Sequence, residues 1–139
     1  MNNRNSAYWI LPLSWLILVF YLSLQSGDDS SKISLYISEK LASNIPPETM
    51  HAFVRSSAHF CIHFVLAILC YCAAYYNTEQ PAKFTAITCI IIAIVDEVIQ
   101  LIAPGRFLEL ADIMLNVSGT IIALAVCTFI APKPQSPHI

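Results

Sequence analysis

Ionisable and amide side chains that could bind or transform a ligand interrupt the long apolar segments of this 139-residue chain. They recur four residues apart in three sets: Arg55, His59 and His63; Asp96 and Gln100; Asp112 and Asn116. Residues at this spacing lie on one face of a helix, so each set should project in one direction. A cluster of these residue types can hold an anion and transfer protons.

The chemistry expected of each residue type follows from its charge and shape. Guanidinium groups match the oxygens of a phosphate, so Arg55 and Arg106 are predicted to bind one. His59 is predicted to act as general acid, general base or nucleophile. A carboxylate would orient His59 or serve as the base, and the candidates are Asp96, Glu97 and Asp112. The neighbouring amide side chains are predicted to contact the substrate: Gln25, Gln100 and Asn116.

A metal ion is a further use for the same three carboxylates. Carboxylate oxygens suit Mg²⁺ or Mn²⁺. However, Asp96, Glu97 and Asp112 follow no fixed ligand spacing. No metal ligand is therefore predicted, and the sequence leaves the cofactor open.

The composition is that of a membrane protein. Apolar residues make up 57% of the chain and charged residues only 12%, with a mean hydropathy of +0.65, which is too little charge to solvate a compact globule. The net charge of −2, without a basic block, excludes a nucleic-acid partner. All five cysteines lie inside apolar segments, and their odd number favours a packing role over a disulfide framework.

Four apolar segments are each close to the ~20 residues needed to cross a membrane: residues 7–24, 57–76, 82–103 and 110–131. No A-x-A-like cleavage site follows the first segment, so we interpret it as a retained helix rather than a signal peptide. Short links after the second and third segments require antiparallel neighbours. The sequence therefore predicts one all-α membrane domain over residues 1–139, with four transmembrane helices in an up-down-up-down bundle.

Two further segments complete the expected organisation. Residues 32–45 carry apolar side chains at helical spacing, which predicts a short amphipathic helix at the membrane surface between the first two spans. Residues 132–139 contain three prolines, which predicts a disordered tail.

Alternation of the spans then places almost all of the polar residues on one side of the membrane. The count of lysine and arginine residues does not decide which side this is.

The cost of polar groups in a membrane favours a functional role for this cluster. A charged side chain at bilayer depth costs several kcal/mol unless it faces protein or water. Interhelical hydrogen bonds in membranes return only about 1 kcal/mol each, so a purely structural network would be inefficient. A channel or proton-coupled transporter is disfavoured, because the other half of each span offers no polar path. We therefore favour a binding or reaction site.

Several motifs together resemble, in order, those of the VanZ family of bacterial membrane proteins. They are YLSLQSG at residues 21–27, RSSAHF at 55–60, DEVIQ at 96–100, PGR at 104–106 and DIMLNVSG at 112–119. The resemblance covers roughly residues 16–125. The family usually has R-K-x-A-H-F followed by a tyrosine, whereas this chain has Ser56 and His63 at those positions.

The resemblance implies a four-helix domain in the bacterial inner membrane, with both termini cytoplasmic and the polar cluster facing the extracytoplasmic side. The family's founding member is associated with resistance to teicoplanin, a glycopeptide that acts at the cell-wall precursor. The resemblance thus implies a role in the cell envelope that affects glycopeptide susceptibility.

Two functions of the polar cluster stay open at this point. The first is an enzyme acting on a lipid-linked or phosphorylated envelope substrate, because a cleft at the membrane surface suits a polar head whose tail lies in the bilayer. The alternative is a non-catalytic protein that binds a membrane lipid or a wall-precursor head group. The alternative needs the same arginines but no acid or base. The sequence predicts no oligomeric state.

Overall fold

The computed structural model describes residues 6–41 and 46–131, which fold into helices joined by short links. A short 3₁₀ helix, η1 (Ala7–Trp9), leads into α2 (Ile10–Ser23). Four further helices follow: α3 (Gly27–Leu41), α4 (Pro47–Tyr75), α5 (Pro81–Gln100) and α6 (Leu110–Ile130). The described residues contain no strand, so the all-α prediction is confirmed.

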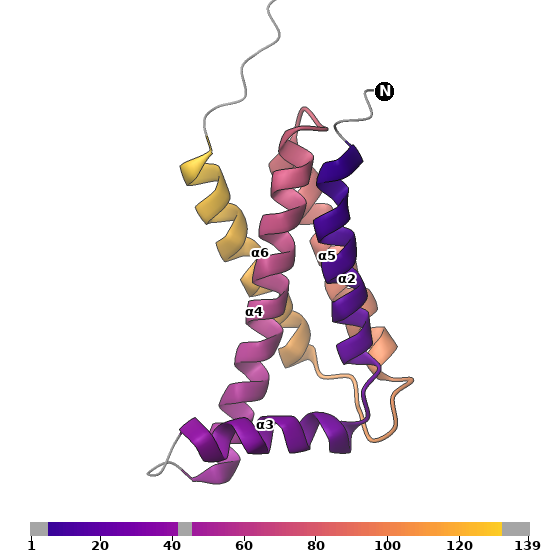
Figure 1. Ribbon diagram of the computed structural model, residues 1–139, viewed down its shortest axis with the longest axis vertical. Coiled ribbons are helices and arrows are strands. Elements are labelled where there is room, and N and C mark those ends of the chain that lie inside the picture. The colour runs from indigo at the N-terminus through magenta and orange to yellow at the C-terminus, as the bar shows by residue number, and fades with distance from the viewer. Residues whose placement is uncertain (1–5, 42–45, 132–139) are drawn as a thin grey trace, which may run out of the picture.

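Four of the helices form a bundle, and the remaining helix crosses one end of it (Figure 1). In chain order, α2, α4, α5 and α6 alternate in direction. α4 and α5 contact one another, and each also contacts α2 and α6. α3 crosses the end at which α2 and α5 finish and α4 and α6 begin. α2 starts and α6 finishes at the opposite end. The α3 end of the bundle is therefore the end at which the sequence analysis placed almost all of the polar residues.

The chain bends by 104° between α2 and α3, and this bend is fixed at Gly27. The Gly27 N–H donates to the carbonyl oxygen of Pro104 at 2.9 Å. A Cβ at Gly27 would lie 2.5 Å from the carbonyl oxygen of Gly105, so only glycine permits this approach of the two backbones. The start of α3 is thereby attached to the link between α5 and α6, residues 101–109.

The ends of three helices differ from the predicted boundaries. α3 begins five residues before the predicted amphipathic helix. The last residue of that predicted helix, Ile45, lies outside the described residues, and so does the predicted tail at 132–139. α4 begins ten residues before the predicted span, because the helix continues through polar residues that hydropathy does not mark. α5 stops at Gln100, three residues early, where i→i+3 hydrogen bonds from Leu101 onward tighten the chain into a turn.

Helix length and composition can be compared directly with the thickness of a membrane. α4 and α6 are long and apolar enough to cross, and α2 with α3 would count as a third, bent span. α5 has 20 residues but carries Lys83, Asp96 and Glu97, and α2 alone has only 14 residues. By length and composition, the described helices thus give two or three crossings, fewer than the four predicted from hydropathy.

Small residues bring the helices close together. The buried core cluster consists of Leu66, Ala67, Cys70, Cys89 and Ala123. Gly119 of α6 packs directly against α4, since a Cβ there would lie 2.5 Å from the carbonyl oxygen of Phe60. The indole N–H of Trp15 donates to the carbonyl oxygen of Ile62 at 3.0 Å and fastens α2 to α4. Close packing over small residues is typical of helices within a membrane.

Burial in this bundle is the reverse of that in a water-soluble protein. Phe129 and Met114 of α6 are 91% and 72% exposed. His63, Glu97 and Asn116, in contrast, have no exposed surface. An apolar exterior around a polar interior fits a protein whose outer surface contacts lipid.

Candidate functional site

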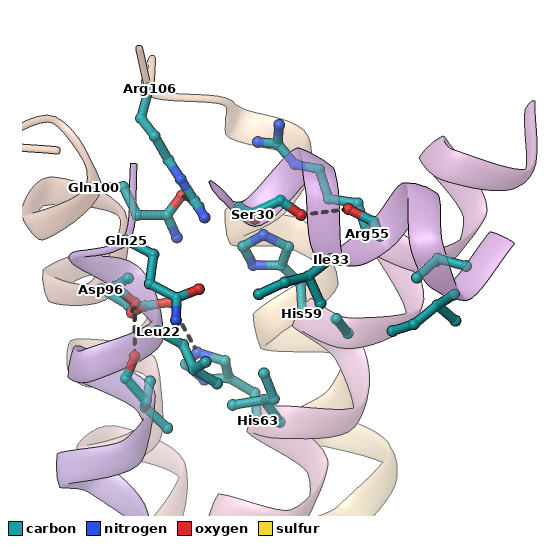
Figure 2. Close-up of a pocket in the computed structure, with 17 residues that line it drawn as sticks. Leu22, Gln25, Ser30, Ile33, Arg55, His59, His63, Asp96, Gln100 and Arg106 are labelled. Atoms are coloured by element: carbon teal, nitrogen blue, oxygen red, sulfur yellow. Dashed lines mark hydrogen bonds and ion pairs between the residues drawn. The ribbon is translucent and has the colours of Figure 1, made fainter. Parts of the chain in front are cut away.

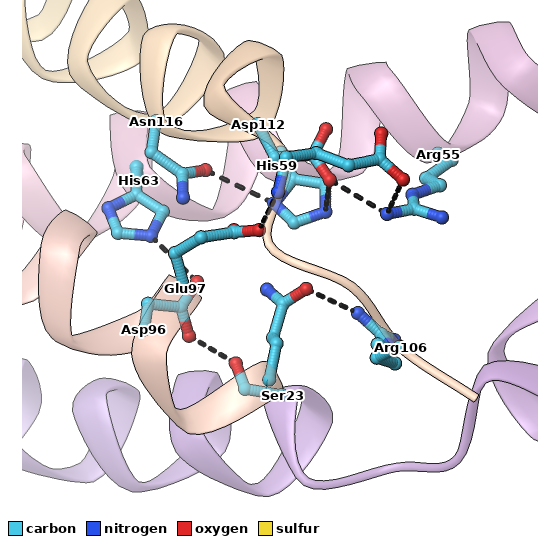
Figure 3. Close-up of polar contacts among 11 residues, drawn as sticks. Ser23, Arg55, His59, His63, Asp96, Glu97, Arg106, Asp112 and Asn116 are labelled. Carbon is cyan, nitrogen blue, oxygen red and sulfur yellow. Dashed lines mark hydrogen bonds and ion pairs between the residues drawn. The ribbon is translucent and has the colours of Figure 1, made fainter. Parts of the chain in front are cut away.

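One polar network joins α4 to α6 near the α3 end of the bundle (Figure 3). Arg55 Nη2 lies 2.8 Å from Asp112 Oδ2 and 3.3 Å from Glu109 Oε1. The ring of His59, one turn further along α4, lies between two α6 side chains. Its Nε2 is 3.4 Å from Asp112 Oδ2, and its Nδ1 is 3.3 Å from Asn116 Oδ1. We call these five residues the α4–α6 network.

A second polar network joins α2, α4 and α5 one turn deeper in the bundle. The Ser23 hydroxyl donates to Asp96 Oδ1, and His63 Nε2 lies 3.4 Å from Asp96 Oδ2. Both oxygens of this carboxylate therefore have a partner, and Asp96 is only 3% exposed. We call Ser23, His63 and Asp96 the Asp96 network.

Glu97 follows Asp96 in sequence but has a different environment. It is fully buried, and its Oε1 accepts a hydrogen bond from the backbone N–H of Glu109 at 2.7 Å. Glu109 is the N-cap residue of α6, where backbone N–H groups lack helical partners. Glu97 thus attaches α5 to the start of α6.

A cavity of about 240 Å³ lies between α2, α3, α4 and α5 (Figure 2). Its polar lining comes from all four helices and from the α5–α6 link: Ser23, Gln25, Ser30, Ser34, Arg55, His59, His63, Asp96, Gln100 and Arg106. Its apolar lining comes from α2, α3 and α4: Val19, Leu22, Ile33, Ile37, Val54, Ala58 and Ile62. The cavity therefore presents charged and amide groups together with an aliphatic wall.

The predicted site residues divide into two groups with respect to this cavity. Six of them line it: Gln25, Arg55, His59, Asp96, Gln100 and Arg106. The other three do not line it: Glu97, Asp112 and Asn116. Asp112 and Asn116 nevertheless contact the ring of His59, which does line the cavity.

Four polar lining residues were not in the predicted site, namely Ser23, Ser30, Ser34 and His63. Ser23 lies within the YLSLQSG motif, and His63 continues the four-residue spacing of Arg55 and His59, so these two had a signal in the sequence. Ser30 and Ser34 belong to α3, and they had no such signal.

Arg106 has an environment unlike that of Arg55. Its Nη1 donates to Gln100 Oε1 at 2.8 Å, a neutral partner. Within residues 6–41 and 46–131, no carboxylate oxygen lies within the 4 Å of an ion pair with Arg106. Burial, and then the nearby positive charge of Arg55, lowers the pKa of Arg106. A guanidinium remains protonated despite such a change, so Arg106 carries its charge into the cavity.

The described residues do not bring three or more histidine, cysteine, aspartate or glutamate side chains together in an arrangement that could hold a metal ion. Asp96 is hydrogen-bonded to Ser23, Glu97 to the Glu109 backbone, and Asp112 pairs with Arg55. The three carboxylates considered above as metal ligands thus have separate partners. They do not converge on one point.

The fold and the site together define a helical membrane protein with a polar cavity at one end of its bundle. A family model described as VanZ/LLP1 matches residues 8–131. Since this match covers most of the chain, the protein belongs to the VanZ/LLP1 family, as the motifs predicted. No curated protein and no solved structure matches the chain significantly.

Proposed function

We propose that the chain crosses the membrane four times, through η1–α2, α4, α5 and α6. At 1.5 Å per α-helical and 2.0 Å per 3₁₀ residue, η1–α2 is about 27 Å long and α5 about 30 Å, close to the ~30 Å core of a bilayer. The carboxylates of α5 face the bundle, since Asp96 and Glu97 are buried. They therefore do not oppose insertion next to lipid.

In this arrangement α3 lies along the membrane surface. It is strongly inclined to α2, and its apolar Leu35 and Tyr36 are exposed, as expected of an interfacial helix. At the other end of the bundle, Tyr8 and Tyr76 stack with ring centroids 4.4 Å apart. Tyrosines gather at membrane interfaces, so this pair would mark the opposite surface. Family membership supports the bacterial inner membrane, cytoplasmic termini and an extracytoplasmic cavity.

The function that the geometry supports best is binding of the head group of a lipid-linked or phosphorylated envelope substrate. The observation that carries this proposal is the composition of the cavity between α2, α3, α4 and α5. Arg106 and Gln100 offer donors for a phosphate, while Val19, Leu22 and Ile62 offer an aliphatic wall for a chain. An amphiphile needs both features within reach of one another, at the depth where a head group meets the hydrocarbon.

Binding is favoured over chemistry by the contacts of the acid–base candidates. Both ring nitrogens of His59 face partners on α6, and both oxygens of Asp96 face Ser23 and His63. A general base must reach the proton that it removes, so either group would first have to exchange a partner for the substrate. Acid–base processing of the bound head group is the second candidate, favoured by the pairing of His59 with Asp112, which could orient the ring.

Occupation of this site by an envelope component would connect the cavity with the glycopeptide phenotype of the family. In the proposed function, expression of the chain lowers susceptibility to teicoplanin, and variants that close the cavity restore it.

Native mass spectrometry of the purified protein tests the proposal. A phosphorus-containing lipid is expected to co-purify with the chain. Ala58→Trp places an indole into the cavity without changing a charge, and should remove this lipid. Ala52→Trp is the matched control, since Ala52 is exposed on the same helix but does not line the cavity. Equal lipid content in the two variants would refute a ligand in this cavity.

A further inference from the structure

We propose that the two arginines of the cavity have different roles. Arg106 receives the phosphate of a lipid head group, and the contact of Gly27 with Pro104 and Gly105 positions it there. Arg55, in contrast, is a structural partner of Asp112. This inference deepens the proposed function and rests on it.

The charge of Arg55 is already compensated. Its guanidinium lies between Asp112 and Glu109, at 2.8 and 3.3 Å. The side chain of Asp112 is only 5% exposed, so releasing Arg55 to bind a phosphate would leave a buried carboxylate with His59 as its remaining partner. A buried charge that loses its partner is strongly unfavourable. Arg55 is therefore held by α6 rather than available to a ligand.

Arg106 is available to an anion. Among the described residues, its guanidinium donates to the Gln100 amide oxygen alone, so most of its five N–H donors remain for a ligand. Gln25, Gln100 and Arg106 all point into the cavity from the side opposite α4 (Figure 2). Amide N–H groups beside a guanidinium can share the oxygens of one phosphate group.

The position of Arg106 depends on the bend between α2 and α3. Gly105 has φ +74°, a conformation that L side chains rarely adopt, and Arg106 follows it directly. The carbonyl groups of Pro104 and Gly105 contact Gly27, one by a 2.9 Å hydrogen bond and the other at a distance that excludes a side chain. Any residue larger than glycine at position 27 must push this link, and Arg106 with it, away from the cavity.

The aliphatic wall identifies the phosphate as that of a lipid. Ile33 and Ile37 of α3 line the cavity together with Leu22 of α2. Ile33 is also 50% exposed. An acyl chain bound along these residues would leave the cavity beside α3 and continue into the bilayer. A free phosphate ion would gain nothing from this wall.

The test measures lipid affinity of the full chain in a neutral detergent by titration in native mass spectrometry. The probes are phosphatidylglycerol, diacylglycerol without a phosphate, and inorganic phosphate. Wild type should bind phosphatidylglycerol most tightly. Arg106→Gln should weaken this binding about 10- to 100-fold, the equivalent of one charge-assisted hydrogen bond or two. Lys83→Gln, which removes an exposed positive charge outside the cavity, is the control and should have no such effect.

Arg55 is tested together with its partner. The double variant Arg55→Gln/Asp112→Asn removes both charges, so neither is left buried alone, and its affinity should stay within about threefold of wild type. Gly27→Ala should weaken binding about tenfold or more by displacing Arg106. Gly119→Ala is its control, because a Cβ there disturbs the packing of α6 on α4 and lowers the melting temperature without touching the link.

The outcomes separate the inference from the proposed function. If wild type binds phosphatidylglycerol no better than diacylglycerol, the proposed function is wrong. If it binds the phospholipid but Arg106→Gln does so equally well, or the Arg55 double variant loses as much, the assignment of Arg106 is wrong. Equal affinity for inorganic phosphate would overturn the lipid assignment. Equal losses in the Gly27 and Gly119 variants would overturn the positioning role of Gly27.

Discussion

The ion pair between Arg55 and Asp112 should couple α4 to α6 by an amount that can be worked out from the structure. At the 2.8 Å separation of Nη2 and Oδ2, the attraction is about 6 kcal/mol at an effective dielectric constant of roughly 20. Most of this is offset by the desolvation of Asp112. Arg55 is one-third exposed and also contacts Glu109, so water and a second carboxylate replace part of what is lost. We expect a net coupling of about 1.5 kcal/mol.

A double-mutant cycle measures this coupling. The free energy of unfolding is followed by circular dichroism during SDS titration of mixed micelles, for wild type, Arg55→Gln, Asp112→Asn and the double variant. The two single variants should together lose more stability than the double variant, by the coupling energy. The reason is that Arg55→Gln leaves the buried Asp112 without its cation, whereas Asp112→Asn leaves Arg55 only the more exposed Glu109.

The control cycle uses an exposed ion pair outside the bundle. Lys32 and Asp29 of α3 lie 3.6 Å apart, with side chains 77% and 64% exposed. Their coupling should stay below about 0.5 kcal/mol, since exposed pairs are screened by water. A coupling for Arg55 and Asp112 as small as that of the control pair would refute the account of a locked α4–α6 network.

Three further predictions concern the fold. Trp15→Phe removes the donor to the Ile62 carbonyl and should cost about 1 kcal/mol, measured in the same SDS titration; no change would mean that this bond does not fasten α2. Gly119→Ala should lower the melting temperature, because its Cβ would meet a main-chain oxygen of α4, and an unchanged value would contradict the close packing. In intact cells, a membrane-impermeant maleimide should label Lys32→Cys but not Glu79→Cys, and the reverse pattern would invert the proposed orientation.

Helical periodicity and the alternation of apolar segments were sufficient to predict where the polar residues gather. Arg55 and His59 do share one face of α4, and they do meet side chains from the start of α6. Asp96 lies in the last turns of α5, and α5 finishes at the same end of the bundle. These features follow from 3.6 residues per turn and from the direction of each helix, which the sequence encodes locally.

The division of roles within the site could not be predicted in the same way. Asp96 and Glu97 are adjacent and chemically equivalent, yet successive residues of a helix point about 100° apart. One therefore lines the cavity and the other holds the start of α6. Which of the two faces the cavity depends on how α5 packs against its neighbours. The pairing of Arg55 depends likewise on the close approach of α6 to α4 at Gly119.

The contribution of α3 to the cavity could not be predicted from a local sequence pattern either. Its apolar residues predicted a helix at the membrane surface, but its side chains Ser30, Ser34 and Ile33 complete the wall of the cavity. This requires the 104° bend and the contact of Gly27 with the α5–α6 link, which join segments almost 80 residues apart in sequence. Hydropathy carries no information on such a contact.

The distribution of charge within the site argues for a ligand independently of any motif. The α4–α6 network is compensated internally, since Arg55 balances carboxylates of α6. Asp96 lies 3.4 Å from His63, and Glu97 accepts a hydrogen bond from the backbone at the start of α6. Arg106 is different: in the described part of the chain, no carboxylate oxygen lies within 4 Å of its guanidinium. Glutamine at this position could make a similar hydrogen bond to Gln100 without the cost of an uncompensated charge. A positive charge kept at the cavity in this way is what the proposed binding of an anionic head group requires.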